Sequence, residues 1–159
     1  MNRIDNLRTL VAKIGERQTE YLTFFPTFAD RLVSALGDYL SDASSVALSC
    51  AYGEFTFDNG SYGHAALGFE NGKYRIPLMF RLRNFQDSGV SLVRVRVCFT
   101  KDGAKLSAQI SGESALEIDE TDFARLNEYI YSYLCKSLAV ATWFEQNKSD
   151  YQGTGIGFG

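Results

Sequence analysis

Six basic side chains on consecutive predicted strands suggest a binding chemistry more directly than any other residues of this sequence. They lie between residues 73 and 105, a stretch with eight basic and only two acidic residues. The rest of the chain has eight basic and seventeen acidic residues. Arginine guanidinium groups form paired hydrogen bonds with carboxylates and phosphates. We therefore predict an anion-binding surface made of Arg75, Arg81, Arg83, Arg94, Arg96 and Lys105.

Three interpretations of this basic surface are open. The residues solvate one face of a sheet, or they bind an acidic protein, or they bind a nucleic acid backbone. Nucleic acid is the weakest of these, because the sequence pI is about 5.2 and the formal net charge is −3, whereas dedicated nucleic-acid binders are usually basic. The outward positions of the predicted strands also lack aromatic residues on which single-stranded bases could stack. The composition thus favours an acidic protein as the partner.

Cys50 and His64, the only histidine, are the most obvious candidates for a nucleophile and its general base. If the hairpin between them turns at Asn59-Gly60, His64 lies opposite Phe55, and Cys50 lies five residues farther along the strand. At a strand rise of about 3.4 Å per residue this separation is roughly 17 Å, which is too far for proton transfer. We therefore expect no catalytic dyad and no enzymatic activity.

Two further patterns that could bind ions have a structural explanation. Carboxylates cluster between residues 113 and 122 and could hold a hard cation, but acidic residues at a helix start are stabilised by the helix dipole. The glycines of residues 151–159 lack the following helix that a phosphate-binding loop requires. The single histidine and the three widely spaced cysteines do not have zinc-ligand spacing. We predict no metal site and no cofactor.

The first 41 residues contain an apolar residue every three or four positions, which predicts a helix with one apolar stripe. Pro26 removes a backbone donor and disfavours helical geometry at the preceding residue. We therefore expect two helices, at about 3–23 and 26–41, or one helix kinked near Pro26. The stripe would pack inside the monomer or form a symmetric homodimer. Its members are Ile4, Leu7, Val11, Ile14, Tyr21, Phe25, Phe28 and Leu32.

Alternating apolar and polar residues predict antiparallel strands in the middle of the chain. Asn71-Gly72 is a strong signal for a tight hairpin, because both residues tolerate a positive φ. After the strands, Asp119 is expected to cap a long helix at about 120–147. The predicted strands are 45–57, 61–70, 73–83, 91–100 and 105–110.

These elements predict an α+β fold in which a five-stranded antiparallel meander sheet forms a two-layer sandwich with all helices on one face. Residues 1–150 would form one domain, and residues 151–159, with four glycines in nine, would form a flexible tail or add to a sheet edge. The long helix after a meander resembles the outline of helix-grip proteins. That resemblance implies a small-ligand pocket between the sheet and the helix.

The composition indicates a cellular compartment for the protein but does not identify its function. No apolar run reaches the length of about 18 residues that a membrane span needs. The odd number of cysteines, expected to be buried, favours a reducing cytoplasm. We therefore expect a cytoplasmic, non-catalytic binding protein of the inhibitor, immunity or adaptor type that recognises an acidic protein. The alternatives are a small-ligand pocket and a nucleic-acid-backbone binder.

Overall fold

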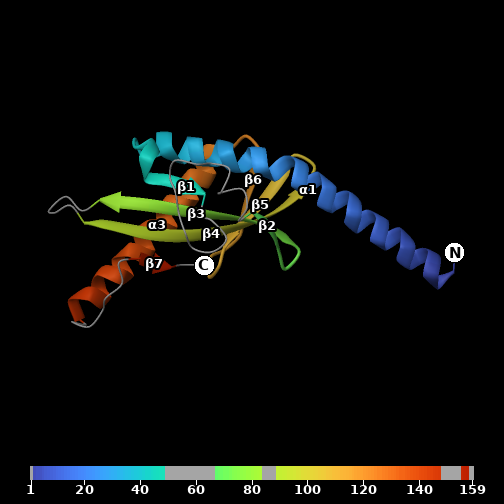
Figure 1. Cartoon of the computed structure of the whole chain (residues 1–159). Helices are drawn as coiled ribbons and strands as arrows, with labels where there is room; N and C mark the ends of the chain where they lie inside the picture. Colours follow the sequence, from blue (N-terminus) through green and yellow to red (C-terminus); the bar gives the residue numbers. More distant parts are fainter. Residues whose placement is uncertain (1, 49–66, 84–88, 148–154, 158–159) are drawn as a thin grey trace.

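The computed structural model describes residues 2–48, 67–83, 89–147 and 155–157, and it has the predicted α+β class (Figure 1). Two long helices and a sheet make up the described part of the chain. In chain order the elements are α1 (Arg3–Tyr39), the short 3-10 helix η1 (Ala43–Ser45), β1 (Val46–Leu48), β2 (Gly68–Glu70), β3 (Lys73–Arg83), β4 (Val90–Asp102), β5 (Lys105–Ile110), β6 (Leu116–Asp119), α3 (Phe123–Asn147) and β7 (Gly155–Gly157).

The sheet has the strand order β1-β3-β4-β5-β6, with β2 also paired to β3 and β7 paired to β4. Every pairing is antiparallel except that of β7 with β4. The predicted meander of β3, β4 and β5 is confirmed, whereas β6 was not expected. Gly155–Gly157 pair with β4 as β7, which agrees with the alternative that the C-terminal residues add to the sheet. Most of the predicted strands 45–57 and 61–70, with Cys50 and His64, lies outside the described residues.

The hairpin between β2 and β3 turns at Asn71-Gly72, as predicted. Asn71 has a φ of 52° and Gly72 a φ of 77°, which is the left-handed geometry that a two-residue hairpin turn requires. Glu70 and Lys73 pair on either side of the turn. This turn therefore fixes which side chains of β3 face inward.

One apolar cluster fills the space between the inner face of the sheet and both helices. The ring of Phe25 in α1 stacks on Tyr74 of β3, with 4.7 Å between the ring centroids, and Phe28 stacks on Phe123 of α3 at 5.4 Å. Tyr74 lies directly opposite Phe99 of β4. Both helices thus cover the same face of the sheet, and the predicted two-layer arrangement is confirmed.

The N-terminal helix is a single helix of 37 residues, with Pro26 inside it, rather than the two helices expected. Proline removes one helical hydrogen bond, and the carbonyl that loses its donor belongs to Leu22, which lies on the exposed side of α1. On the other side of the helix, Phe25 and Phe28 are buried on either side of Pro26. Their burial against the sheet outweighs the local cost of proline.

The C-terminal helix begins later than predicted. Asp119 is the last residue of β6, and its Oδ1 accepts a hydrogen bond from the amide of Thr121 at 3.2 Å. Asp122 instead accepts from the amide of Arg125 at 3.3 Å and caps α3. The apolar side of α3 is buried at Leu126, Ile130 and Leu134, whereas Val140 is exposed.

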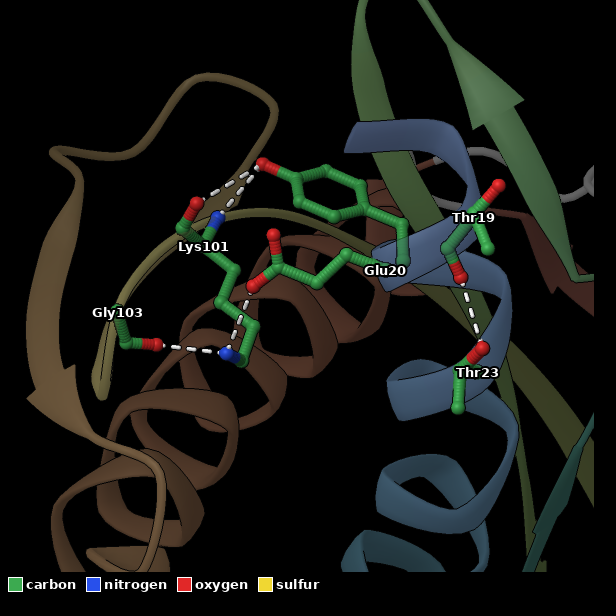
Figure 2. A network of polar contacts seen from close by, with 6 residues as sticks. Thr19, Glu20, Thr23, Lys101 and Gly103 are labelled. Atoms are coloured by element: carbon green, nitrogen blue, oxygen red, sulfur yellow. Dashed lines mark hydrogen bonds and ion pairs between the residues drawn. The ribbon is translucent and has the colours of Figure 1, made fainter. Parts of the chain in front are cut away.

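Two parts of α1 differ in their surroundings. Residues 3–18, here called the arm, extend beyond the sheet into open space, while the rest of α1 lies along it (Figure 1). The boundary is a network around Lys101 (Figure 2). Tyr21 Oη accepts from the Lys101 amide at 2.8 Å, and Lys101 Nζ donates to Glu20 Oε1 at 3.0 Å and to the Gly103 carbonyl at 2.6 Å. These bonds fix the point where the arm leaves the sheet.

Candidate functional site: an arginine ladder on the outer face of the sheet

Five of the six predicted anion-binding residues form a single row along the β3–β4 pair. The antiparallel register places one arginine on each of five successive rungs of the outer face, which is the face opposite the helices. We call this row the arginine ladder. Its rungs are Arg75 opposite Cys98, Arg96 opposite Pro77, Arg94 opposite Met79, Arg81 opposite Leu92, and Arg83 opposite Val90.

The ladder has a regular geometry because same-face residues repeat every two positions along a strand. This repeat is about 6.8 Å, so five rungs span about 27 Å. No rung carries two arginines, which avoids the repulsion of like charges directly across a strand pair. Each arginine faces an uncharged side chain instead, and the long stem of arginine can cover such a neighbour while its guanidinium reaches outward.

The ladder arginines differ in exposure. Arg83 and Arg94 are exposed, whereas Arg75, Arg81 and Arg96 are half-buried. Met79, between two ladder residues on β3, is only 1% exposed although it lies on the outer face. Four of the arginines (Arg75, Arg81, Arg94 and Arg96) also take part in interactions within the protein. The outer face therefore includes a buried residue, Met79, and arginines that interact with other groups of the protein.

Arg83, at one end of the ladder, acts electrostatically on a nearby carboxylate. The pKa of Asp42 is lowered mainly by the hydrogen bonds that its side chain accepts from the hydroxyl and amide of Ser44, and to a smaller extent by the positive charge of Arg83. The hydroxyl bond measures 2.6 Å and the amide bond 3.0 Å. The positive charge at this end of the ladder thus helps to lower the pKa of the Asp42 carboxyl group.

Lys105 does not join the ladder. It lies at the start of β5, directly opposite Asp102 of β4 on one side and Asp119 of β6 on the other. Asp102 is six residues along β4 from Arg96, or about 20 Å at the rise of a strand. Lys105 also lines a hollow of about 570 Å³ in which Asp102, Glu117 and Asp119 outnumber the basic side chains. The predicted grouping of Lys105 with the arginines is therefore not what the register shows.

Lys73 replaces Lys105 as the lysine closest to the ladder. Together with Arg96 it lines a hollow of about 410 Å³ on the outer face, without any acidic side chain in the lining. Lys73 Nζ donates to Gln109 Oε1 at 2.9 Å, and Gln109 Nε2 donates to the Glu113 carbonyl at 3.2 Å. The alternation of β3 already placed Lys73 on the outer face. The sequence alone did not reveal that β5 pairs with β4 in the register that brings Gln109 beside Lys73.

The predicted carboxylate cluster has structural partners. Glu113 forms an ion pair with Lys136 at 3.0 Å, and Asp122 lies 3.9 Å from Arg125. Asp119 accepts from both the amide and the hydroxyl of Thr121. Among the described residues, no group of three or more His, Cys, Asp or Glu side chains is placed to hold a metal ion.

Cys135 and Tyr129 lie on the same helix, α3, but have different surroundings. Cys135 is exposed and Cys98 is half-buried, so the expected burial is wrong for Cys135, while Cys50 lies outside the described residues. Tyr129 Oη donates to the Ser114 carbonyl at 2.8 Å and accepts from the Ile110 amide at 3.1 Å, and burial raises its pKa. Tyr129 therefore ties α3 to β5 instead of offering a binding surface.

Comparisons with known proteins add no family to these observations. No protein-family model matches the chain, and no curated protein or solved structure shows significant similarity to it. Neither described helix combines the length and the apolar character that crossing a membrane requires. The geometry of the surfaces is therefore the basis for assigning a function.

Proposed function

We propose that the protein is a non-catalytic binding protein that recognises an acidic segment of a protein partner through the arginine ladder. The observation that carries this proposal is the placement of one arginine on each of five successive rungs. In an extended peptide, alternate side chains are about 6.8 Å apart, which equals the rung spacing. A partner strand with carboxylates at alternate positions therefore offers one carboxylate to each guanidinium, in the paired geometry that arginine favours.

The charge distribution of the chain supports a protein partner over a nucleic acid. The formal net charge is −3, so a long polyanion meets repulsion away from the ladder, whereas a short acidic segment interacts with the ladder alone. Charge complementarity of this kind gives specificity and fast association more than affinity. Inhibitors, immunity proteins and adaptors work by such contacts, and we place this protein in that class.

The reducing cytoplasm is the compartment that we propose for this activity. Cys135 is an exposed thiol on α3, and Cys98 is a thiol on the outer face of the sheet beside Arg75. Exposed thiols persist in a reducing compartment and are prone to oxidation outside it. The hollow lined by Lys73 and Arg96 lies next to the same rung and would receive the end of the acidic segment.

The test compares two variants with equal charge change. The first is Arg81→Glu, Arg94→Glu and Arg96→Glu on the ladder, and the matched control is Lys13→Glu, Lys105→Glu and Lys136→Glu away from it. The probe is a fluorescent twelve-residue peptide of alternating Glu and Thr, and its affinity is measured by anisotropy at several salt concentrations. We expect the ladder variant to bind at least tenfold more weakly, and the control to stay within twofold of the original protein.

Because four ladder arginines interact within the chain, a milder variant keeps the test decisive. Arg81→Gln, Arg94→Gln and Arg96→Gln removes the charges without adding new ones, and circular dichroism checks that each variant is folded. Equal weakening in the ladder and control variants would show general attraction and contradict the proposal. Tighter binding of a twelve-nucleotide oligothymidylate than of the peptide would instead assign the ladder to nucleic acid.

A further inference from the structure

The arm exposes a row of large apolar side chains that no other described part of the protein covers. Between 51% and 67% of the surface of each of these side chains is exposed. On a protein surface, apolar residues that are scattered singly need no explanation, but a contiguous patch rimmed by polar residues marks a binding site. We call this row the arm seam, and it consists of Ile4, Leu7, Val11 and Ile14.

The arm seam has the spacing of a coiled coil. Its members repeat with steps of three and four residues, so they occupy the two apolar positions of a heptad, a and d. The row is narrow, as a seam for one partner helix is, and not a broad face of the type that packs on a sheet. Leu10, which is 48% exposed, lies in the adjacent g position and extends the apolar surface. The arm of sixteen residues is about 24 Å long.

The charges beside the arm seam are basic. In the heptad defined by the seam, Arg3 and Arg17 occupy g positions and Arg8 an e position, and these are the positions that form ion pairs with a partner helix. Asp5 and Glu16 fall on the opposite side of the helix. Asp5 accepts from Arg8 Nη1 at 3.2 Å, but both side chains are largely exposed, and exposed pairs of this kind are weak and readily exchanged.

These flanking charges disfavour a second copy of the chain as the partner. In a parallel pair of arms, Arg3 of one copy would lie across from Arg8 of the other. In an antiparallel pair with Ile4 against Ile14, Arg3 would lie across from Arg17, and the two Arg8 side chains would face each other. Both arrangements bring like charges together, which is a common device against wrong partners.

A partner helix with acidic residues at its own e and g positions replaces each of these like-charge contacts with a contact between opposite charges. We propose that the arm seam binds an amphipathic helix of another protein that carries apolar residues at its own seam and Glu or Asp beside it. The arm is ready for such a partner, because its helix continues from the anchored part of α1 and its first turn is capped by Asn2, whose Oδ1 accepts from the Asp5 amide at 2.9 Å. The cost of starting a helix is therefore already met before binding.

The composition of the arm also favours a protein helix over a lipid surface. Helices that lie in a membrane interface carry Trp, Phe or Leu on the apolar face and a polar face rich in Lys and Arg. The arm has leucines but no aromatic residue, and the side opposite the seam is mixed in charge, with Asp5 and Glu16 beside Lys13, instead of uniformly basic. This binding site is separate from the arginine ladder, so the fate of either proposal leaves the other unchanged.

The test uses the full chain and two synthetic peptides of three heptads, both with Ile at a and Leu at d. One peptide has Glu at every e and g position, and the other has Lys there. Fluorescence anisotropy should show at least tenfold tighter binding of the Glu peptide. The double variant Leu7→Ala and Val11→Ala should lose at least tenfold in affinity, whereas Leu22→Ala, which removes an equally exposed leucine outside the arm seam, should stay within twofold.

A charge-reversed arm completes the test. The variant Arg3→Glu, Arg8→Glu and Arg17→Glu should bind the Lys peptide at least tenfold more tightly than the Glu peptide. Equal binding of the two peptides, or binding that survives the double alanine variant, would overturn the proposal. Sedimentation velocity that shows a dimer, abolished by the double alanine variant, would assign the arm seam to a second copy. Stronger binding to vesicles of phosphatidylserine and phosphatidylcholine than to the Glu peptide would assign it to lipid.

Discussion

The two halves of α1 have the same apolar period but opposite surroundings. In residues 21–36 the stripe is buried, and Tyr21 and Phe25 are 1% and 0% exposed. In the arm the stripe continues without a change of spacing, yet Val11 is 67% exposed. The sheet and α3 supply the partner of the first half, and nothing among the described residues covers the second. Periodicity therefore identifies a face that is suited to burial but does not say whether the same chain provides the cover.

The strongest way to test this comparison is to truncate one apolar side chain in each half. Phe25→Ala should lower the free energy of unfolding by about 3–5 kcal/mol, because it leaves a cavity among the rings of the core. Leu7→Ala should change it by less than about 0.5 kcal/mol, because Leu7 is exposed. Urea denaturation measures both. A loss of several kcal/mol for Leu7→Ala would mean that the arm is covered in solution.

Pro26 offers a test of how firmly the sheet holds the buried half. Pro26→Ala restores the amide that bonds to the Leu22 carbonyl and removes a cost of about 3 kcal/mol in a helix interior. Part of this gain is offset, because proline also restricts the unfolded chain by about 0.4–1 kcal/mol. We expect a net increase of about 2–2.6 kcal/mol in the free energy of unfolding. Thr27→Ala, at an exposed neighbour, serves as the control, and a loss of stability for Pro26→Ala would contradict this account.

The boundary between the two halves depends on the hydroxyl of Tyr21. Tyr21→Phe keeps the buried ring but leaves the Lys101 amide without the acceptor that it has at 2.8 Å. Losing such an acceptor costs about 1–3 kcal/mol of unfolding free energy. Tyr131→Phe, at an exposed tyrosine of α3, should cost less than about 0.5 kcal/mol. Equal costs for the two variants, measured by thermal and urea unfolding, would show that the network does not anchor the arm.

The sequence predicted the parts of the fold that have a strong local signal. The alternation of apolar and polar residues predicted the bounds of β3 correctly, and Asn71-Gly72 predicted the hairpin turn between β2 and β3. The strand β6 was missed because it is only four residues long, and β7, with three residues, was foreseen only as one of two alternatives for the C-terminal residues. Such short segments carry too few alternating positions, and β7 depends on pairing with a distant strand. The single helix was missed because the cost of Pro26 is local, whereas the packing that outweighs it is tertiary.

The candidate site shows the same division between local and tertiary information. Strand parity placed Arg75, Arg81 and Arg94 on one face, because parity is a local property. It also placed Lys105 on that face, but it could not show how far along the sheet Lys105 lies. That distance depends on the register, and β5 pairs with only the last six residues of β4. The exposure of the arm seam could not be predicted either, because an apolar stripe in a sequence does not show whether another element packs against it.

The far end of the buried half is tied to α3 by Tyr39, and this contact gives a pH-dependent prediction. Tyr39 Oη donates a hydrogen bond to Glu128 Oε2. That bond raises the pKa of Tyr39 to about 12, with smaller contributions from partial desolvation and from the negative charge of Glu128. Because the pKa in the folded state lies above the ordinary value of about 10, the stabilisation is complete below pH 10 and is lost as the pH rises through about 12.

Tyrosinate absorbance during alkaline titration measures this effect. The difference between the original protein and Tyr39→Phe reports mainly Tyr39, with a smaller contribution from Tyr131, whose charge also acts on Tyr39. Glu128→Gln should return the pKa of Tyr39 towards 10, because it removes the charged acceptor. The effect on overall stability should be the smallest of the four predictions, since Tyr39 is 40% exposed and water screens the contact. An unchanged titration in Glu128→Gln would show that the side-chain tie is absent, and the two ends of α1 would then differ in apolar burial alone.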